Sequence, residues 1–301
     1  MSSTRNNQER LDAQNVEASN QQLPPENENN ETSAPQGLNF SVPTEFVDLP
    51  SKGMYYPANH PLHGVDSLEI KYMTAKEEDI LSSQALIRKG VAIDRMLQSV
   101  LIDKNVQVKD LLVGDKNALT VAARVTGYGP DYVTKVVCPA CSSEQEFGFD
   151  LTDVSMTGAS FEREQINEYI EDVEVTENNT FLVNLPKSKH VVELRMLTGA
   201  DEEKLTKFQN HKNKKNGKTA TSTLLTDTLK SIITSIAGVK DRKQINNFVD
   251  NMPAMDSRYL RGVYQKLVPN IDMTQTFTCD SCGHEQDLEV PVTTDFFWPQ
   301  Q

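Results

Sequence analysis

The sequence predicts an α+β fold built from an internally duplicated unit, and three observations support this expectation. A strand-like run that carries Cys-x-x-Cys occurs twice, at 132–147 and 274–288. A strand that leads into a threonine and an acidic helix start also occurs twice, at 68–81 and 192–205. Further helical segments lie between these two features in each half. Strand, helices and cysteine hairpin therefore recur in the same order, which is the pattern of an internal repeat.

Composition narrows the class of protein before any motif is considered. The chain has 301 residues and a formal net charge of −13, and its sequence pI is about 4.9. So acidic a chain is not expected to bind a phosphate backbone without sequence preference. Its mean hydropathy is −0.51, and no apolar run is long enough to predict a membrane-spanning helix. The first residues lack the pattern of a secretory signal, so we expect the thiols to lie in a reducing cytosol.

Residues 1–41 are rich in Asn, Gln, Glu, Ser and Pro and contain almost no large apolar side chains. A segment of this kind cannot bury enough surface to offset the entropy that it would lose on ordering. The sequence therefore predicts a disordered N-terminal arm. The arm is either a dispensable tail or a tether that becomes ordered on a partner.

The ordered part is expected to open at 44–58 with a turn. Proline fixes φ and glycine can take a positive φ, so the run Leu-Pro-Ser-Lys-Gly has turn chemistry. Apolar side chains gather around this turn, and two interpretations remain open. They pack as a strand-turn-strand on their own domain, or they form an exposed anchor for another subunit. The candidate partner-binding residues are Leu49, Pro50, Lys52, Gly53, Tyr55 and Tyr56.

The first repeat is expected at 42–151. A strand at 67–73 leads into Thr74, and Glu77 follows at the position of a capping box, from which its carboxylate can reach the amide of the cap residue. The helix that begins there is expected to end at Gly90. Two further helices are predicted before the first cysteine hairpin, one from about residue 92 and one at 116–125.

Residues 152–185 contain an acidic, Asn-rich stretch, and we interpret them as a connector between the halves. The second repeat is expected at 186–301. Its strand runs into Thr198, which again precedes acidic residues that suit the positive end of a helix dipole. Apolar spacing predicts helices at about 222–238, 241–251 and 256–267, and an inserted basic loop is expected at 211–218.

The four cysteines of the chain form two Cys-x-x-Cys pairs, a spacing at which two thiolates in a tight turn can bind one metal ion. A dithiol redox site would need its first cysteine at a helix N-terminus, whereas the flanking residues here resemble strands. Disulfides and free thiols are further alternatives. His284 could also be a ligand, but it is more simply a surface residue of the turn. The sequence thus predicts structural Zn²⁺ held by Cys138, Cys141, Cys279 and Cys282.

Each half supplies only two thiolates, and two thiolates cannot complete a tetrahedral site. The simplest solution is one zinc ion per chain, shared by the two halves as in a zinc ribbon. Such an ion would join distant parts of the chain and contribute directly to folding. Two alternatives remain: each pair recruits other ligands, or pairs from neighbouring subunits share a metal.

No convincing catalytic set is present, so the chain is not expected to be an enzyme. The sequence lacks a glycine-rich phosphate loop and the His-Glu-x-x-His pattern of metalloproteases. His60 and His63 have helical spacing, but Pro61 and Gly64 disfavour a helix there. A zinc ion bound by four cysteines also has no free position for a catalytic water.

One segment supports a different class of protein. The lysines of the expected loop at 211–218 could contact nucleic-acid phosphates, which would make the chain a zinc-ribbon regulatory protein that binds DNA or RNA. The acidic pI disfavours that alternative, and a solvated surface loop is the simpler interpretation. The lysines concerned are Lys212, Lys214, Lys215 and Lys218.

Three stretches also resemble a known family: the turn at 49–53, the strand and helix start at 68–78, and the Cys-x-x-Cys hairpin. There the sequence is similar to T4-type bacteriophage baseplate proteins, in particular the hub subunits and hub assembly proteins of contractile-tailed phages. The resemblance covers about 44–150 and is weaker at 190–292.

This resemblance implies a non-enzymatic protein that acts through contacts with other baseplate and tail proteins. Its expected location is the tail baseplate of the virion or, during assembly, the host cytoplasm. The long N-terminal arm and the doubled core depart from the compact members of the family. The sequence therefore leaves open whether the chain is a mature structural subunit or an assembly factor that leaves.

Overall fold

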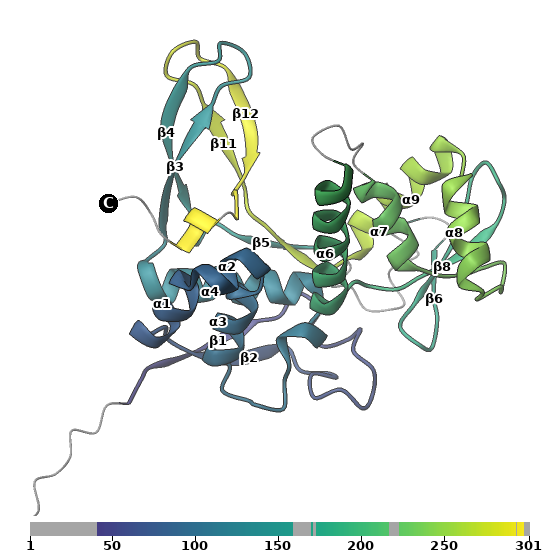
Figure 1. Ribbon diagram of the computed structural model, residues 1–301, viewed down its shortest axis with the longest axis horizontal. Coiled ribbons are helices and arrows are strands. Elements are labelled where there is room, and N and C mark those ends of the chain that lie inside the picture. Colours follow the sequence, from purple (N-terminus) through teal and green to yellow (C-terminus); the bar gives the residue numbers. More distant parts are fainter. Residues whose placement is uncertain (1–40, 159–169, 171–172, 217–222, 293, 298–301) are drawn as a thin grey trace, which may run out of the picture. The chain divides into compact units, whose positions relative to one another are not determined.

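The computed structural model describes residues 41–158, 170, 173–216, 223–292 and 294–297. Its contacts group residues 42–301 into one compact unit, separate from residues 1–41, and the description below concerns the former. That unit contains helices and short antiparallel sheets (Figure 1), so the expectation of an α+β fold is confirmed. The predicted arm lies almost wholly outside the described residues.

The first part of the fold is a two-stranded sheet followed by helices. Strand β1 (Thr44–Asp48) pairs with β2 (Ser67–Lys71), and β2 turns Leu68 and Ile70 into the core. Because alternate residues of a strand point to opposite faces, one face of this small sheet is apolar. The elements that follow are α1 (Ala75–Ser82), α2 (Gln84–Lys89), α3 (Ala92–Val100), the 3₁₀ turn η1 (Val108–Asp110) and α4 (Val113–Tyr128).

Helix α1 begins as the sequence predicts. The Glu77 carboxylate accepts hydrogen bonds from the Thr74 amide at 3.0 Å and the Thr74 hydroxyl at 2.6 Å. It also pairs with Lys71 at 2.9 Å and accepts a hydrogen bond from Ser99 at 2.6 Å. The Glu77 side chain is fully buried, so this one carboxylate connects β2, α1 and α3.

The second part contains a four-stranded antiparallel sheet in the order β6-β7-β8-β9. The helix start at Thr198 repeats the cap of α1: the Asp201 carboxylate accepts a hydrogen bond from the Thr198 amide at 3.2 Å and pairs with Arg195 at 2.6 Å. The strands are β6 (Val173–Val175), β7 (Phe181–Asn184), β8 (Val191–Leu194) and β9 (Ile233–Ile236). The helices are α6 (Gly199–Asn216), α7 (Leu224–Ile232), α8 (Arg242–Asp250) and α9 (Ala254–Leu267).

The two equivalent caps follow strands that belong to different sheets. The strand before Thr74 belongs to the two-stranded sheet with β1, whereas the strand before Thr198 is an inner strand of four. The internal likeness is therefore local in the described residues: it holds for the caps and the cysteine hairpins, and the sheets around them differ.

Three sequence expectations about elements need correction. The helix predicted at 222–238 ends at Ile232, and the next four residues form β9, because β8 offers them ladder hydrogen bonds and they are β-branched at three of four positions. The basic loop expected at 211–218 is helical as far as Asn216. The single helix expected to run to Gly90 breaks at Ser83 into α1 and α2.

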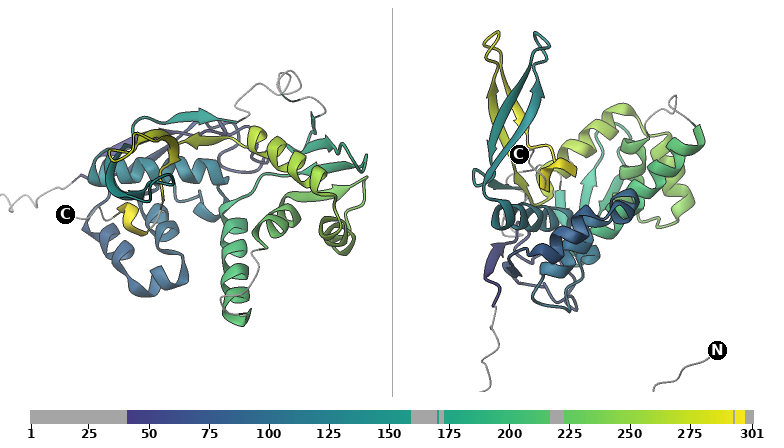
Figure 2. Two further views of the ribbon diagram at one scale, coloured as in Figure 1. Left: turned by 90° about the horizontal axis from the view of Figure 1, so that it is seen from above. Right: turned by 60° about the vertical axis from the view of Figure 1, so that its left-hand side comes forward.

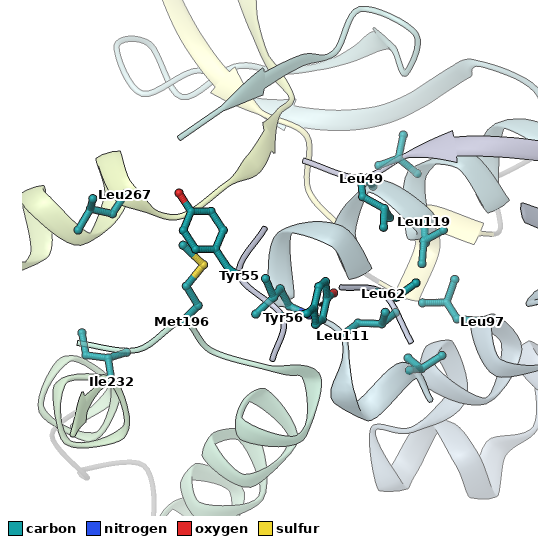
Figure 3. Close-up of a cluster of buried hydrophobic side chains, with 14 of the residues drawn as sticks. Leu49, Tyr55, Tyr56, Leu62, Leu97, Leu111, Leu119, Met196, Ile232 and Leu267 are labelled. Atoms are coloured by element: carbon teal, nitrogen blue, oxygen red, sulfur yellow. Dashed lines mark hydrogen bonds between the residues drawn. The ribbon is translucent and has the colours of Figure 1, made fainter. Parts of the chain in front are cut away.

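One apolar cluster runs through both parts (Figure 3). Leu49, Leu97 and Leu119 from the first part and Ile232 and Leu267 from the second belong to it. Across the described residues, none of the helices combines the length and the apolar character needed to cross a bilayer.

Glycine at one position permits a close approach between the parts of this core. A Cβ added to Gly114 near the start of α4 would lie 1.9 Å from the Pro269 carbonyl oxygen. Only glycine therefore lets α4 lie directly against the segment that leads into β10 (Asn270–Asp272). Strand β10 in turn pairs with β5 (Ser155–Thr157).

Two β-hairpins complete the fold and lie side by side (Figures 1 and 2). The first hairpin consists of β3 (Asp131–Val137) and β4 (Glu144–Asp150), and it follows directly on α4. The second consists of β11 (Thr274–Thr278) and β12 (Glu285–Glu289), and it follows directly on β10. The pairing of β10 with β5 thus holds the bases of both hairpins together.

Candidate metal centre

The tips of the two hairpins have the same backbone geometry. In each, the amide of the first cysteine donates to the carbonyl five residues later: Cys138 to Ser143 and Cys279 to His284, both at 2.9 Å. The carbonyl of that cysteine accepts from the residue four positions later, at 2.8 Å in both. Two hydrogen bonds thus close each Cys-x-x-Cys into a tight turn.

The residue after each second cysteine has a positive φ, of 60° at Ser142 and 69° at Gly283. This left-handed conformation is disfavoured for side chains other than glycine, and a serine adopts it only where its surroundings require it. The two Cys-x-x-Cys turns are therefore equivalent in their backbone geometry, as the sequence predicts.

The turns bring all four thiols together. Their sulfur atoms lie within 4.8 Å of one another. Two sulfur contacts join the hairpins: Cys138 to Cys282 at 3.8 Å and Cys141 to Cys279 at 3.7 Å. A tetrahedral centre with metal–sulfur bonds of about 2.3 Å has edges of about 3.8 Å, so the donor set has the dimensions of a four-thiolate metal site.

The same distances contradict the disulfide alternative. A disulfide bond is about 2.05 Å long, far shorter than either cross-hairpin distance. All four cysteines are free thiols. Among the described residues the ligand cluster consists of these four cysteines and does not include His284.

A small apolar cluster packs against two of the thiols. Cys138 and Cys279 are buried beside Phe277, while Cys141 and Cys282 are exposed. The Phe277 ring meets the Phe147 ring of the first hairpin edge to face, with 5.4 Å between centroids. The two hairpins therefore share one interior, which fixes the distance between the cysteine pairs.

Two glutamines also connect the hairpins through backbone groups. Gln145 donates to the Thr278 carbonyl at 3.3 Å and accepts from the Asp280 amide at 2.9 Å. Gln275 accepts from the Asp150 amide at 3.0 Å and donates to its carbonyl at 2.6 Å. Sequence reasoning missed both roles. The Glu-Gln dipeptide that follows each cysteine pair was the available signal for Gln145.

The Ser143 hydroxyl lies 3.0 Å from the Cys141 sulfur and 3.3 Å from the Cys279 sulfur. It lowers the pKa of both thiols, that of Cys279 to about 6. The backbone amide of His284 favours the Cys282 thiolate, but burial and the three neighbouring cysteine thiols together outweigh it and raise the pKa of Cys282 to about 12. Thiolates so close repel one another, and a bound cation removes that repulsion. The four cysteines could therefore hold a metal ion.

The predicted partner-binding turn lies mainly in the core (Figure 3). Leu49, Tyr55 and Tyr56 are 0%, 6% and 2% exposed, and Pro50 and Gly53 are also buried. These five residues pack within their own chain, as the first of the two sequence interpretations has it. Only Lys52 among the six is exposed.

A buried carboxylate binds this turn through several hydrogen bonds. Asp115 accepts hydrogen bonds from the Ser51 amide at 2.9 Å, the Ser51 hydroxyl at 2.6 Å and the Tyr56 hydroxyl at 2.7 Å. The Tyr56 oxygen also accepts from the Leu112 amide at 3.0 Å. Burial raises the pKa of Asp115. Sequence reasoning missed this network because 64 positions separate Ser51 from Asp115.

The remaining sequence candidates are not brought together. His60 stacks on Tyr56 with 4.4 Å between ring centroids, and the Nδ1 atom of His63 lies 2.8 Å from the Tyr56 carbonyl oxygen. The metal-type cluster found in the described part of the chain does not include them. Lys212, Lys214 and Lys215 lie on α6, and Lys218 lies outside the described residues.

Comparison with known proteins gives one result. A family model described as T4 bacteriophage base plate protein matches residues 43–298. This range includes both hairpins, all four cysteines and every described helix. No curated protein and no solved structure matches the chain.

Proposed function

Since this chain belongs to the T4 bacteriophage base plate protein family, we propose that it is a structural or assembly protein of the baseplate hub in a contractile-tailed phage. Membership makes it a baseplate protein, whose partners are other phage proteins and whose place is the virion tail. The position in the hub is our proposal, and the resemblance of the turn at 49–53 and of the first cysteine hairpin to hub proteins supports it.

We further propose that the four cysteines hold one structural Zn²⁺ per chain. The observation that carries this proposal is the sulfur geometry, with cross-hairpin distances of 3.8 and 3.7 Å. When bound, zinc would supply four metal–sulfur bonds and no open position, because the thiolates fill a tetrahedral shell. Since 144 positions separate Cys138 from Cys282, the ion would stabilise the folded chain by linking two segments that are distant in the sequence.

A non-enzymatic role agrees with how the chain uses its buried acids. Glu77 caps α1, and Asp115 binds the turn at Ser51. Asp256 accepts from the amides of Lys187 and Ser188 at 2.7 and 2.8 Å. Each carboxylate thus accepts hydrogen bonds from backbone amides of the same chain. We propose that the chain acts through protein contacts alone.

An internal duplication would account for the paired hairpins and caps. The hairpins share their turn geometry, and the caps share a basic residue, a threonine and an acid at equal spacing. We propose that one unit was duplicated and that the sheets around the caps diverged afterwards.

The deciding experiment has two parts. Elemental analysis of the purified, reduced chain, combined with its native mass, should give one zinc per monomer. Two zinc ions per monomer, or none in a folded sample, would overturn the shared site. In parallel, mass spectrometry of purified baseplates and of assembly intermediates should detect the chain. Its presence in both indicates a mature subunit, and its presence in intermediates alone indicates an assembly factor. Absence from both would contradict the proposed function.

A further inference from the structure

The two hairpins form a matched pair whose solvent-facing sides differ. We define the outer face of each hairpin as its exposed alternate residues, which turn away from the shared interior. On the first hairpin these are Asp131, Val133, Lys135, Val137, Glu144, Glu146, Gly148 and Asp150. On the second they are Thr274, Thr276, Thr278, Glu285, Asp287 and Glu289.

The second hairpin serves as the reference for comparison, because its outer face consists of polar side chains, as expected for a strand surface that faces solvent. Threonines and carboxylates alternate along it, with an ordinary cross-strand bond of 3.0 Å from Thr276 to Asp287. Counting from the cysteines, Thr274 and Thr278 correspond to Val133 and Val137 of the first hairpin. Those valines are 51% and 60% exposed. The first hairpin thus presents two apolar side chains to solvent at positions where the second has hydroxyls.

The outer face of the first hairpin has a second unusual feature, which is Gly148. It stands opposite Val133 in the ladder, as Glu289 stands opposite Thr274. A Cβ added to Gly148 would meet only the Val133 Cγ2 atom, at an ordinary 3.8 Å. The chain's own packing therefore does not require glycine there, although glycine weakens a strand. A bare backbone opposite the exposed Val133 suits the close approach of another molecule.

Charge indicates what that molecule is. Asp131, Glu144, Glu146 and Asp150 surround the valines, and the one basic residue, Lys135, pairs with Glu144 at 3.2 Å. This rim is acidic, so a second copy of the chain docked face to face would bring like charges together. An apolar patch bordered by lysines or arginines would meet it with complementary charge.

We propose that the outer face of the first hairpin, centred on Val133, Val137 and Gly148, is the docking surface for another baseplate protein that offers an apolar patch with a basic rim. This inference rests on the proposed function. The interior shared with the second hairpin holds the strand in place before binding, which lowers the entropy lost on docking.

The test gives the first hairpin the outer face of the second. The variant Val133→Thr/Val137→Thr/Gly148→Glu makes three changes whose side chains are already accommodated in the equivalent ladder. The probe is the baseplate complex isolated from particles that lack this chain. Added wild-type chain should bind it, and the triple variant should bind at least about tenfold more weakly. A matched control, Thr274→Ser/Thr278→Ser, alters the second outer face and should bind as the wild type does.

Several outcomes would overturn the proposal. Wild-type affinity in a triple variant that keeps its metal content and thermal midpoint would show that the face is not used. A wild-type dimer in sedimentation that the triple variant abolishes would identify a second copy as the occupant instead. If the wild-type chain itself fails to bind and is absent from baseplates, the proposed function fails as well. If it is present in baseplates and the variant enters them equally, only this inference fails.

Discussion

The sulfur atoms of Cys138 and Cys282 lie 3.8 Å apart, although 144 positions separate the two residues. Each belongs to a different hairpin, so the contact depends on how the hairpins pack and not on either turn alone. A metal ion bound here would add a further link between the hairpins, because its ligands come from both of them.

The first prediction concerns that centre. Cys141→Ser should reduce bound zinc from one per chain to below about 0.1 and lower the free energy of unfolding by at least about 3 kcal/mol, because a structural metal contributes directly to folding. Elemental analysis and urea denaturation measure the two effects. The exposed neighbour Ser281 supplies the control, and Ser281→Ala should leave both quantities unchanged. Full zinc content in the Cys141 variant would contradict a four-cysteine site.

The second prediction concerns Glu77 and pH. Burial opposes ionisation of this carboxyl group, but hydrogen bonds from Lys71, Ser99 and Thr74 outweigh it and hold its pKa at about 2, below the ordinary 4.5. A depressed pKa in the folded state contributes stability above pH 4.5, and this contribution is lost as pH falls towards 2. Glu77→Gln should therefore destabilise the chain at pH 7, by about 2–3 kcal/mol.

The pH dependence identifies the carboxylate as the cause. The difference between the wild type and Glu77→Gln, measured by urea denaturation, should shrink as pH falls through the range from 4.5 to 2. The exposed neighbour is the control, and Glu78→Gln should change stability by less than about 0.5 kcal/mol. A difference that stays constant with pH would mean that Glu77 acts by packing only.

The third prediction concerns the turn network. Tyr56→Phe removes a hydroxyl that donates to Asp115 and accepts from the Leu112 amide. Both partners are buried, so the loss should cost about 1–3 kcal/mol. Combining it with Ser51→Ala should give a non-additive total, because both residues serve one carboxylate. Tyr128→Phe, whose hydroxyl bond is exposed, is the control. Additive losses would show that the bonds act independently.

The fourth prediction concerns Arg124, a fully buried cation. It donates to the carbonyls of Phe296 at 2.7 Å, Gly129 at 2.7 Å and Asp131 at 3.0 Å. These bonds join α4 to the start of the first hairpin and to the C-terminal turn. Arg124→Met should lower the free energy of unfolding by about 3–5 kcal/mol, because three carbonyls lose a charged donor.

Limited proteolysis shows which segment of the chain is destabilised in Arg124→Met. The segment that contains Phe296 should become cleavable in Arg124→Met before the rest of the chain unfolds, since its backbone loses the hydrogen bond from Arg124. The exposed Arg258→Met is the matched control and should show neither effect. Equal protection of this segment in the wild type and in Arg124→Met would contradict the anchoring role.

Patterns between near neighbours were readable in the sequence. Thr74 and Glu77 are three positions apart, and their mutual cap depends only on helix geometry. Cys138 and Cys141 share one tight turn for the same reason. Prediction failed where a distant strand competed with local preference: the residues after Ile232 continue an apolar helical pattern, yet they pair with β8. Local spacing cannot report a partner that lies some 40 positions away, as Ser235 does from Glu193.

By itself, the sequence determined the class of the fold, the two equivalent Cys-x-x-Cys turns and the family resemblance. Only the tertiary structure decided that the four thiols meet, that Tyr55 and Tyr56 are core residues, and that the outer faces of the hairpins differ. The physical reason is distance along the chain. A turn or a cap is fixed by the geometry of a few consecutive residues, whereas burial and cross-hairpin contacts arise when segments such as those of Ser51 and Asp115, 64 positions apart, pack together.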